Sequence, residues 1–308
     1  MNRNLLLSGK FFLLLFVSLG LLLAGCNRGT KAGGEGSGEF EASGALDAET
    51  QEQLNTAKRI FYSLPSPLET AMLIKNAGAT YNEELLNPTG NTSMYITSKS
   101  KALNLGVYST DLSYASLFDQ TQATLDYIGA AKEMADGLNI LDAINEETIE
   151  TLENNINNRE MIIDIISETL MNSSSFLKEN GLEATASVIL VGGWMEGLYI
   201  ATSLVDDKEL KGNKLVERIV DQKLSLDIMV NLLQQSPEDE DAMTVLDDVK
   251  ALKEIFDKIS IEQGEVTAVE DPETNVTTLK SESSIKITRD VFLELKSKVE
   301  EIRTSYIS

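Results

Sequence analysis

The 308-residue chain is predicted to be all-α, an irregular helical bundle with a long central apolar helix and a small inserted β-hairpin. Apolar residues recur at steps of three and four along most of the chain, which is the period of a helix with one buried face. One stretch is apolar on every side, as the innermost helix of a bundle is. Only one segment has the short β-branched runs that are typical of strands.

Several segments carry the helical period. They are 100–137, 146–179, 213–235, 237–259 and the C-terminal stretch through Leu295, Val299, Ile302 and Tyr306. The 146–179 segment is the clearest, because its apolar positions form one stripe that only Arg159 and Ser173 interrupt. We therefore expect a single long helix there.

Two Ser-Pro pairs mark helix starts. Ser66 is placed as an N-cap, Pro67 as the first helical residue and Glu69 as the third, which is a capping box that opens a helix over 67–77. Gly78 should end that helix. Ser236 and the proline after it repeat the arrangement ahead of the 237–259 helix.

The exception to the helical period lies before the last helix. Residues 265–269 and 276–279 are β-branched runs on either side of a turn, so they predict a hairpin at about 264–282. Oxygen-bearing side chains alternate from Asp271 to Thr277, as in a calcium loop. Val276 stands where such a loop needs glycine, so we expect no metal there.

The stretch 184–205 is the most apolar after the N-terminus, and Glu196 is its only charged residue. Its length would suit a membrane span, but a carboxylate at mid-depth would cost several kcal/mol. We favour a buried core helix instead. Its small residues would allow a neighbouring backbone to come close; they are Ala186, Gly193, Gly197 and Ala201.

Glu196 is the first candidate functional residue, because a buried carboxylate must be paired or protonated. Arg159 or a tyrosine hydroxyl would serve as a structural partner. Alternatively, Glu196 binds a ligand or acts in acid/base chemistry. Trp194 and Tyr199 flank it and would then line the pocket.

A second polar intrusion lies in the 100–137 segment. Tyr108, Asp111 and Tyr114 are spaced by three residues and fall roughly on one helix face, with Phe118 beyond them. They are either satisfied core polar groups or part of a binding site.

Composition excludes several classes of chemistry. The chain has no histidine and one cysteine, so histidine-assisted nucleophiles and conventional zinc sites are absent. No cofactor is expected. With 26 basic and 49 acidic residues and no basic run, nucleic acid is not an expected partner.

The N-terminus carries a targeting signal. Arg3 and Lys10 precede an apolar run that closes on Leu23-Ala24-Gly25-Cys26, with the only cysteine of the chain at its end. This sequence resembles the lipobox of bacterial lipoproteins, which implies cleavage of residues 1–25 and lipidation of Cys26. An uncleaved membrane anchor is the alternative, but the run is shorter than the ~20 residues of a spanning helix. Residues 26–44 are expected to be a lipidated, flexible Gly/Ser tether, and 45–308 a single helical domain.

Together, the lipobox, the tether and the 63–70 element entering a helical body resemble the uncharacterised, mostly helical lipoproteins of Bacteroidota envelopes. The resemblance implies a lipid-anchored protein of the cell envelope and brings no catalytic residue with it. Residues 27–31 lack the acidic run that resembles a surface-export signal, which favours the outer membrane, facing the periplasm.

We therefore expect a membrane-tethered, non-catalytic binding or scaffold module whose partner is an envelope protein or a small molecule. The competing hypothesis is a hydrolase-like enzyme that uses carboxylates and tyrosines, with Glu196 as acid/base beside Asp111. A structural spacer is a third possibility. The first two differ in geometry: an enzyme needs both carboxyls on a cavity open to solvent, whereas a sealed Glu196 argues against catalysis.

Overall fold

The computed structural model describes residues 67–141, 146–156, 158, 161–162, 165, 169, 176–177, 179–271 and 276–308. The chain divides into two compact units, Met1–Asp47 and Ala48–Ser308, and all described residues belong to the second. The signal peptide, Cys26, the tether, Ser66 and Arg159 lie outside the described residues.

The described part is mainly helical, and the all-α class is confirmed. In chain order the elements are α2 (Pro67–Asn76), the 3₁₀ turns η1 (Glu83–Leu85) and η2 (Thr89–Met94), α3 (Ser98–Leu117), α4 (Thr121–Gly137), α5 (Glu146–Asn154), α7 (Glu183–Leu204), α8 (Lys214–Asp221), α9 (Lys223–Leu233), α10 (Glu240–Phe256), β1 (Ser260–Asp271), β2 (Val276–Lys286) and α11 (Arg289–Ile307).

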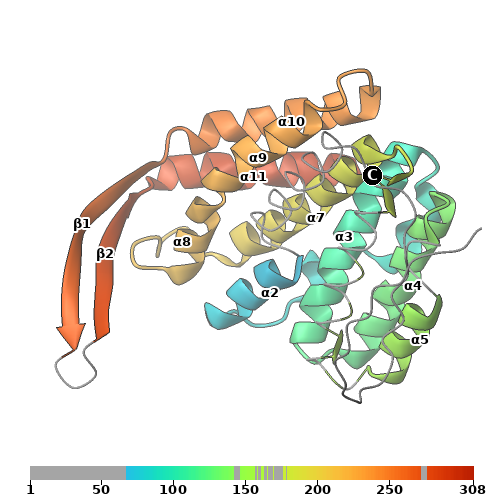
Figure 1. Ribbon diagram of the computed structural model, residues 1–308, viewed down its shortest axis with the longest axis horizontal. Helices are drawn as coiled ribbons and strands as arrows, with labels where there is room; N and C mark the ends of the chain where they lie inside the picture. The colour runs from blue at the N-terminus through green and yellow to red at the C-terminus, as the bar shows by residue number, and fades with distance from the viewer. Residues whose placement is uncertain are drawn as a thin grey trace, which may run out of the picture. The chain divides into compact units, whose positions relative to one another are not determined.

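Helices α3 and α7 lie side by side in the middle of this unit (Figure 1). Helix α4 packs on α3, while α10 and α11 pack on α7 and on each other. Every residue of α3 from Ala102 to Leu117 is buried, although many of them are polar. The hydroxyls of Ser109, Thr110 and Ser113 donate back into the helix, as Ser113 Oγ does to Ser109 O at 2.8 Å. The core is therefore built around two helices, of which only α7 is apolar.

The α3–α7 contact depends on glycine. A Cβ atom on Gly106 would lie 2.1 Å from the carbonyl oxygen of Ile189, and one on Gly192 would lie 2.3 Å from that of Leu103. Thr110 spans the contact and donates from Oγ1 to Gly193 O at 2.9 Å. Gly193 belongs to the predicted small-residue stripe, whereas Gly106 and Gly192 do not. The two backbones touch directly at this crossing.

Helix α7 is long and apolar enough to cross a membrane. In this fold, however, 67% of its most apolar window is buried. A helix in the core of a globular protein can be as long and as apolar as a membrane span. The burial of α7 therefore agrees with the core-helix interpretation of 184–205.

Three predicted helices are shorter than expected. The 100–137 segment forms two helices, since Asp119 between α3 and α4 adopts a positive φ of 59°. The 213–235 segment is divided at Gln222, where α8 ends and α9 begins. The prediction of one continuous helix over 146–179 is wrong as well, because α5 ends at Asn154 and the next two residues form a turn. A continuous apolar stripe does not show where the chain bends.

Helix ends agree with the sequence in part. Helix α2 ends at Asn76, and Gly78 follows with a φ of +87°, as expected. Helix α10 begins later than predicted. Its N-cap is Asp239, which accepts a 2.8 Å hydrogen bond from Ala242 N, so Ser236 is not the cap. The C-terminal helix α11 buries Leu295, Val299, Ile302 and Tyr306 as its period predicts.

Lysines tie several helix ends to their neighbours. Lys75 Nζ donates to Leu117 O at the end of α3. Lys101 Nζ donates to Gly137 O at the end of α4 at 3.1 Å, and Lys223 Nζ donates to Ile259 O just beyond α10 at 3.0 Å. A cation is favourable there because the last carbonyls of a helix carry partial negative charge and lack partners within the helix.

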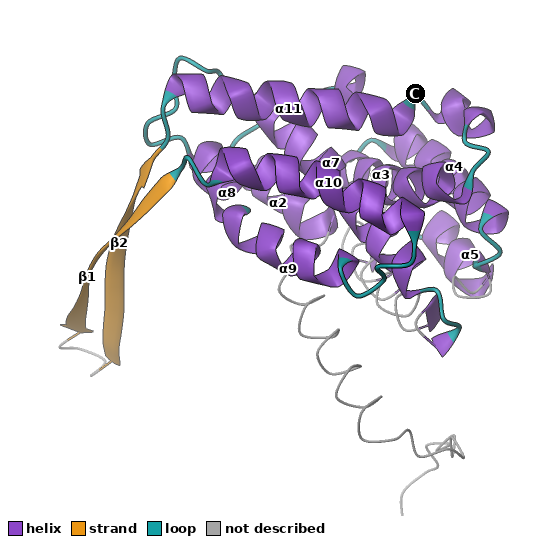
Figure 2. Ribbon diagram, turned by 90° about the horizontal axis from the view of Figure 1, so that it is seen from above, coloured by secondary structure: helices purple, strands orange, loops and turns teal. Residues whose placement is uncertain are grey.

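Strands β1 and β2 form a two-stranded antiparallel sheet, drawn in orange in Figure 2. The register runs from Ser260 opposite Lys286 to Asp271 opposite Val276, with an irregularity between Gln263 and Val266. The segment expected to form a hairpin, about 264–282, falls within these bounds, and residues 272–275 lie outside the described residues.

The glycine crossing yields a test of packing. Replacing Gly106 by alanine should lower the free energy of unfolding by about 1–3 kcal/mol or more, because the added methyl group has backbone on the other side and no room to move. Urea denaturation measures the change.

Gly129 provides the matched control, because it lies in α4 with nothing within 4 Å of the added carbon. Gly129→Ala should raise the free energy of unfolding by about 0.5–1 kcal/mol through the lower entropy of the unfolded chain. Equal stability of the two variants would contradict the close crossing.

Candidate functional site

The predicted face of α3 holds an irregular segment of the chain. Tyr108 Oη donates to Pro88 O at 3.1 Å, and Asp111 Oδ2 accepts from Asn87 N at 3.1 Å. Tyr114 Oη donates to Thr80 O. The three side chains therefore lie on one face of α3, as their spacing predicts. That face binds the backbone of the segment between α2 and α3.

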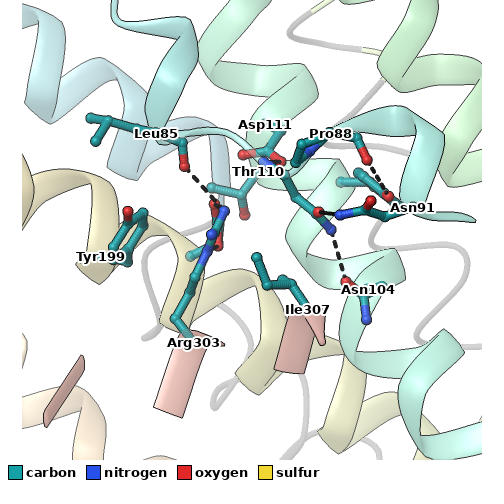
Figure 3. A network of polar contacts seen from close by, with 12 residues as sticks. Leu85, Pro88, Asn91, Asn104, Thr110, Asp111, Tyr199, Arg303 and Ile307 are labelled. Carbon is teal, nitrogen blue, oxygen red and sulfur yellow. Dashed lines mark hydrogen bonds and ion pairs between the residues drawn. The ribbon is translucent and has the colours of Figure 1, made fainter. Parts of the chain in front are cut away.

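Glu196 pairs with Arg303 of α11. Arg303 Nε donates to Glu196 Oε2 and Arg303 Nη2 to Glu196 Oε1, both at 2.8 Å. Arg303 Nη2 also donates to Leu85 O at 3.0 Å, and the Tyr199 ring lies 4.5 Å from the guanidinium carbon. Figure 3 shows Arg303 reaching between Tyr199 and Leu85. This fork-to-carboxylate arrangement is the strongest geometry for such a pair.

The sequence-based choice of partner needs correction. Arg159 lies outside the described residues, and the arginine that contacts Glu196 comes from the C-terminal helix. Arg303 is four residues after Val299 and three before Tyr306, both on the buried face of α11. A cation on an otherwise apolar helix face was the signal that could have identified it.

Asp111 lies beside this pair. Its carboxyl interacts with the side chain of Glu196, and because two ionised carboxylates only accept hydrogen bonds, the two can bond to each other only when one carries a proton. Burial raises the pKa of Asp111 well above its usual range, and the charge of Glu196 raises it further, while Arg303 and Asn87 N act in the opposite direction. We assign the proton to Asp111, because Arg303 bonds both oxygens of Glu196.

The charge of Glu196 is compensated by that of its partner. Burial raises the pKa of Glu196 above its ordinary value, although the hydrogen bonds and charge of Arg303 act in the opposite direction. The cluster is therefore neutral as a whole, because Asp111 is protonated, Glu196 is an anion and Arg303 is a cation. Two carboxyls and one guanidinium in an interior site reach neutrality only in this way.

A neutral amide network continues from the cluster. Asn87 Nδ2 donates to Tyr95 Oη at 2.9 Å and to Asn104 Oδ1 at 3.0 Å. Asn104 Nδ2 in turn donates to Tyr306 O at 2.8 Å, and Tyr95 Oη donates to Ile307 O at 3.2 Å. The network connects α3 and the segment before it to the end of α11. Sequence reasoning missed both asparagines, because asparagine is common in turns and on surfaces.

Trp194 lies apart from this cluster. Its Nε1 donates to Gln222 Oε1 at 3.0 Å, and its ring lines a small cleft beside α2 and α8. The cleft also involves Ile74 and Arg218, and its enclosed space is about 20 Å³, room for about one water molecule. The structure therefore does not place Trp194 in one pocket with Glu196.

The cluster is sealed from solvent. Asp111 and Glu196 are 0% exposed and Arg303 is 7% exposed. Within the described residues, no group of three or more acidic, cysteine or histidine side chains gathers in a way that could hold a metal. The structure thus brings Asp111, Glu196 and Tyr199 together, with Tyr108 and Tyr114 farther along the same helix face as Asp111. Among the described residues, this arrangement connects α3, α7 and α11, and its two carboxyls are not exposed.

Comparison of the chain with family models, with curated proteins and with solved structures found no match. The interpretation of the site therefore rests on its own residues and their geometry.

Arg303 offers a direct test of the buried pair. Replacing it by methionine leaves Glu196 buried without a cation, which should lower the free energy of unfolding by about 3–5 kcal/mol. Arg303→Lys keeps the charge but loses the two-armed contact, so its loss should be smaller. Chemical denaturation of both variants measures the difference.

The control is Lys298→Met, which removes a surface pair with Glu301 on the same helix. The free energy of unfolding should change by less than about 0.5 kcal/mol there. Similar losses for Arg303→Met and Lys298→Met would show that the buried pair contributes nothing special.

Proposed function

We propose that the protein is a lipid-anchored, non-catalytic helical module of the bacterial cell envelope. Cys26 carries the lipid, residues 26–44 form the tether, and the helical domain acts as a binding or scaffold unit. The proposal for the anchor is supported by the match of Leu23-Ala24-Gly25-Cys26 to a lipobox. We further propose that the protein lies at the outer membrane and faces the periplasm, since residues 27–31 lack an acidic run.

The observation that supports a non-catalytic role is that the two carboxyls are buried and already hydrogen-bonded. Asp111 and Glu196 are fully buried, and each is already hydrogen-bonded to groups of the same fold. A general acid or base must come within hydrogen-bond reach of its substrate. Neither group can do so unless a surrounding segment of the chain opens.

The competing proposal is a hydrolase-like enzyme with Glu196 as acid/base and Asp111 beside it. The two carboxyls are indeed neighbours, as that hypothesis requires. However, it also requires an open cavity, and the zero exposure of both residues weighs against it. We therefore favour the binding or scaffold role.

The partner in this proposal is an envelope protein or a small molecule. Removal of residues 1–25 takes away two of the basic residues, which leaves the exported chain still more acidic than the formal charge of −23 of the full sequence. Such a body is repelled by anionic lipid headgroups, so attachment to the membrane depends on the lipid alone.

Anchoring is tested by substitution of the cysteine. Cys26→Ser in a bacterial host should abolish incorporation of a labelled fatty acid and leave residues 1–25 uncleaved, because both steps depend on the cysteine of the lipobox. Ser37→Ala in the tether is the matched control and should keep both properties. Equal labelling of the two variants would refute lipidation at Cys26.

The binding role is tested by cross-linking the lipidated protein in cells, followed by mass spectrometry of captured proteins. Reproducible capture of one envelope protein, retained in Lys298→Met and lost in a variant that unfolds the domain, would support it. Capture of background alone would contradict the protein-partner form of the proposal.

A further inference from the structure

The chain between α2 and α3 is attached to the core chiefly by polar contacts. We call residues 82–96 the connector; it contains the turns η1 and η2 and has only Leu86, Asn87 and Tyr95 buried. Little apolar area is therefore removed from water when the connector docks. Its position depends on hydrogen bonds, and these converge on a few core side chains.

Two of these contacts come from the cluster of Asp111, Glu196 and Arg303. Asp111 Oδ2 accepts from Asn87 N, and Arg303 Nη2 donates to Leu85 O. The same two side chains are linked to each other through Glu196. Any change that disturbs the cluster therefore acts on the connector at adjacent points of its backbone.

The cluster contains one more carboxyl than it has cations. No N–H or O–H group of the described residues donates to Asp111 Oδ1, which leaves this oxygen available to carry the proton and to donate it to Glu196. The other titratable groups that act on Asp111 or respond to its charge are Glu196 on α7, Arg303 on α11, Tyr108 on α3, Tyr127 on α4 and Tyr81 before the connector. None of these supplies a second cation.

We propose that the protonated Asp111 carboxyl is a latch that holds the connector on the core, and that the connector is released as this proton is lost. Ionised Asp111 would add an uncompensated negative charge to an interior site next to Glu196, which is costly. Opening of the connector relieves the cost by admitting water to Asp111. The helices of the core stay folded, since α3 and α7 are held by their own glycine contact.

The sign of the pH dependence follows from linkage. With the connector docked, the pKa of Asp111 is raised; with it open, the group returns toward its ordinary value of about 4. The docked form therefore binds more protons, and opening becomes easier as pH rises. Between the two pKa values the opening equilibrium grows about tenfold per pH unit, and above the higher one it is constant.

Asp111→Asn reproduces the latched state without a titratable proton. Its amide oxygen can accept from Asn87 N, and its amide group can donate to Glu196. The variant is therefore expected to fold and to hold the connector at every pH.

The test is native-state amide hydrogen exchange on the lipidated protein in detergent, with rates corrected for the intrinsic effect of pH. In the lipidated protein with Asp111 in place, protection of the connector amides, including Asn87 N, should fall about tenfold per pH unit as pH rises. Protection in α3 and α7 should stay constant. In Asp111→Asn the connector should show no such fall. Infrared spectroscopy should also show a carboxylic acid band at neutral pH that Asp111→Asn lacks.

Asp248→Asn is the matched control. Asp248 is a partly buried carboxyl of α10 whose pKa is also raised by burial, and it accepts from Tyr306 Oη at 3.0 Å without touching the connector. This variant should keep the pH dependence of the connector. The proposal is overturned if Asp111→Asn keeps it too, if α3 and α7 lose protection together with the connector, or if the acid band is absent.

Discussion

The direct contact between the backbones of α3 and α7 is the constraint on which the rest of the described structure depends. Gly106 and Gly192 leave no room for a side chain at this crossing. Asp111 lies five residues beyond Gly106, and Glu196 lies four beyond Gly192, so the close approach of the helices brings their carboxyls together. A larger separation would have left room for water between the two groups. Helix packing thus determines the electrostatics of the core.

The contact also explains why a strongly polar helix can be central. Helix α3 can bury Asn104, Thr110 and Asp111 because each makes at least one hydrogen bond to a neighbouring element. Buried hydrogen bonds of this kind favour one arrangement of the elements around them. The connector and the end of α11 are held in register by such bonds.

The helical class and the buried faces of α7 and α11 could be predicted from the sequence, because they depend on local periodicity. Tyr108, Asp111 and Tyr114 were correctly placed on one face for the same reason. The break at Asp119 and the pairing of Glu196 with Arg303 could not be predicted in this way. They depend on residues far apart in the chain, 107 positions in the case of the ion pair. Periodicity says which residues are buried, but not which of them meet.

Several of the chain's few cationic side chains lie at contacts between helices. Lys75, Lys101 and Lys223 bind the ends of neighbouring helices, and Arg303 is the cation buried within the described core. Each of these groups joins two separate elements. In a chain with 26 basic and 49 acidic residues, these cations contribute to tertiary contacts between helices.

Glu196 has a further consequence for a chain that is exported as proposed. During translocation the protein is unfolded, and α7 then passes the export channel as an isolated stretch of 22 residues, apolar enough to be retained in the lipid bilayer as a stop-transfer segment. A single charge near the centre of such a segment raises the cost of lateral insertion by about 2.5–3.5 kcal/mol. The carboxylate that pairs with Arg303 after folding thus favours complete passage of the chain before folding begins.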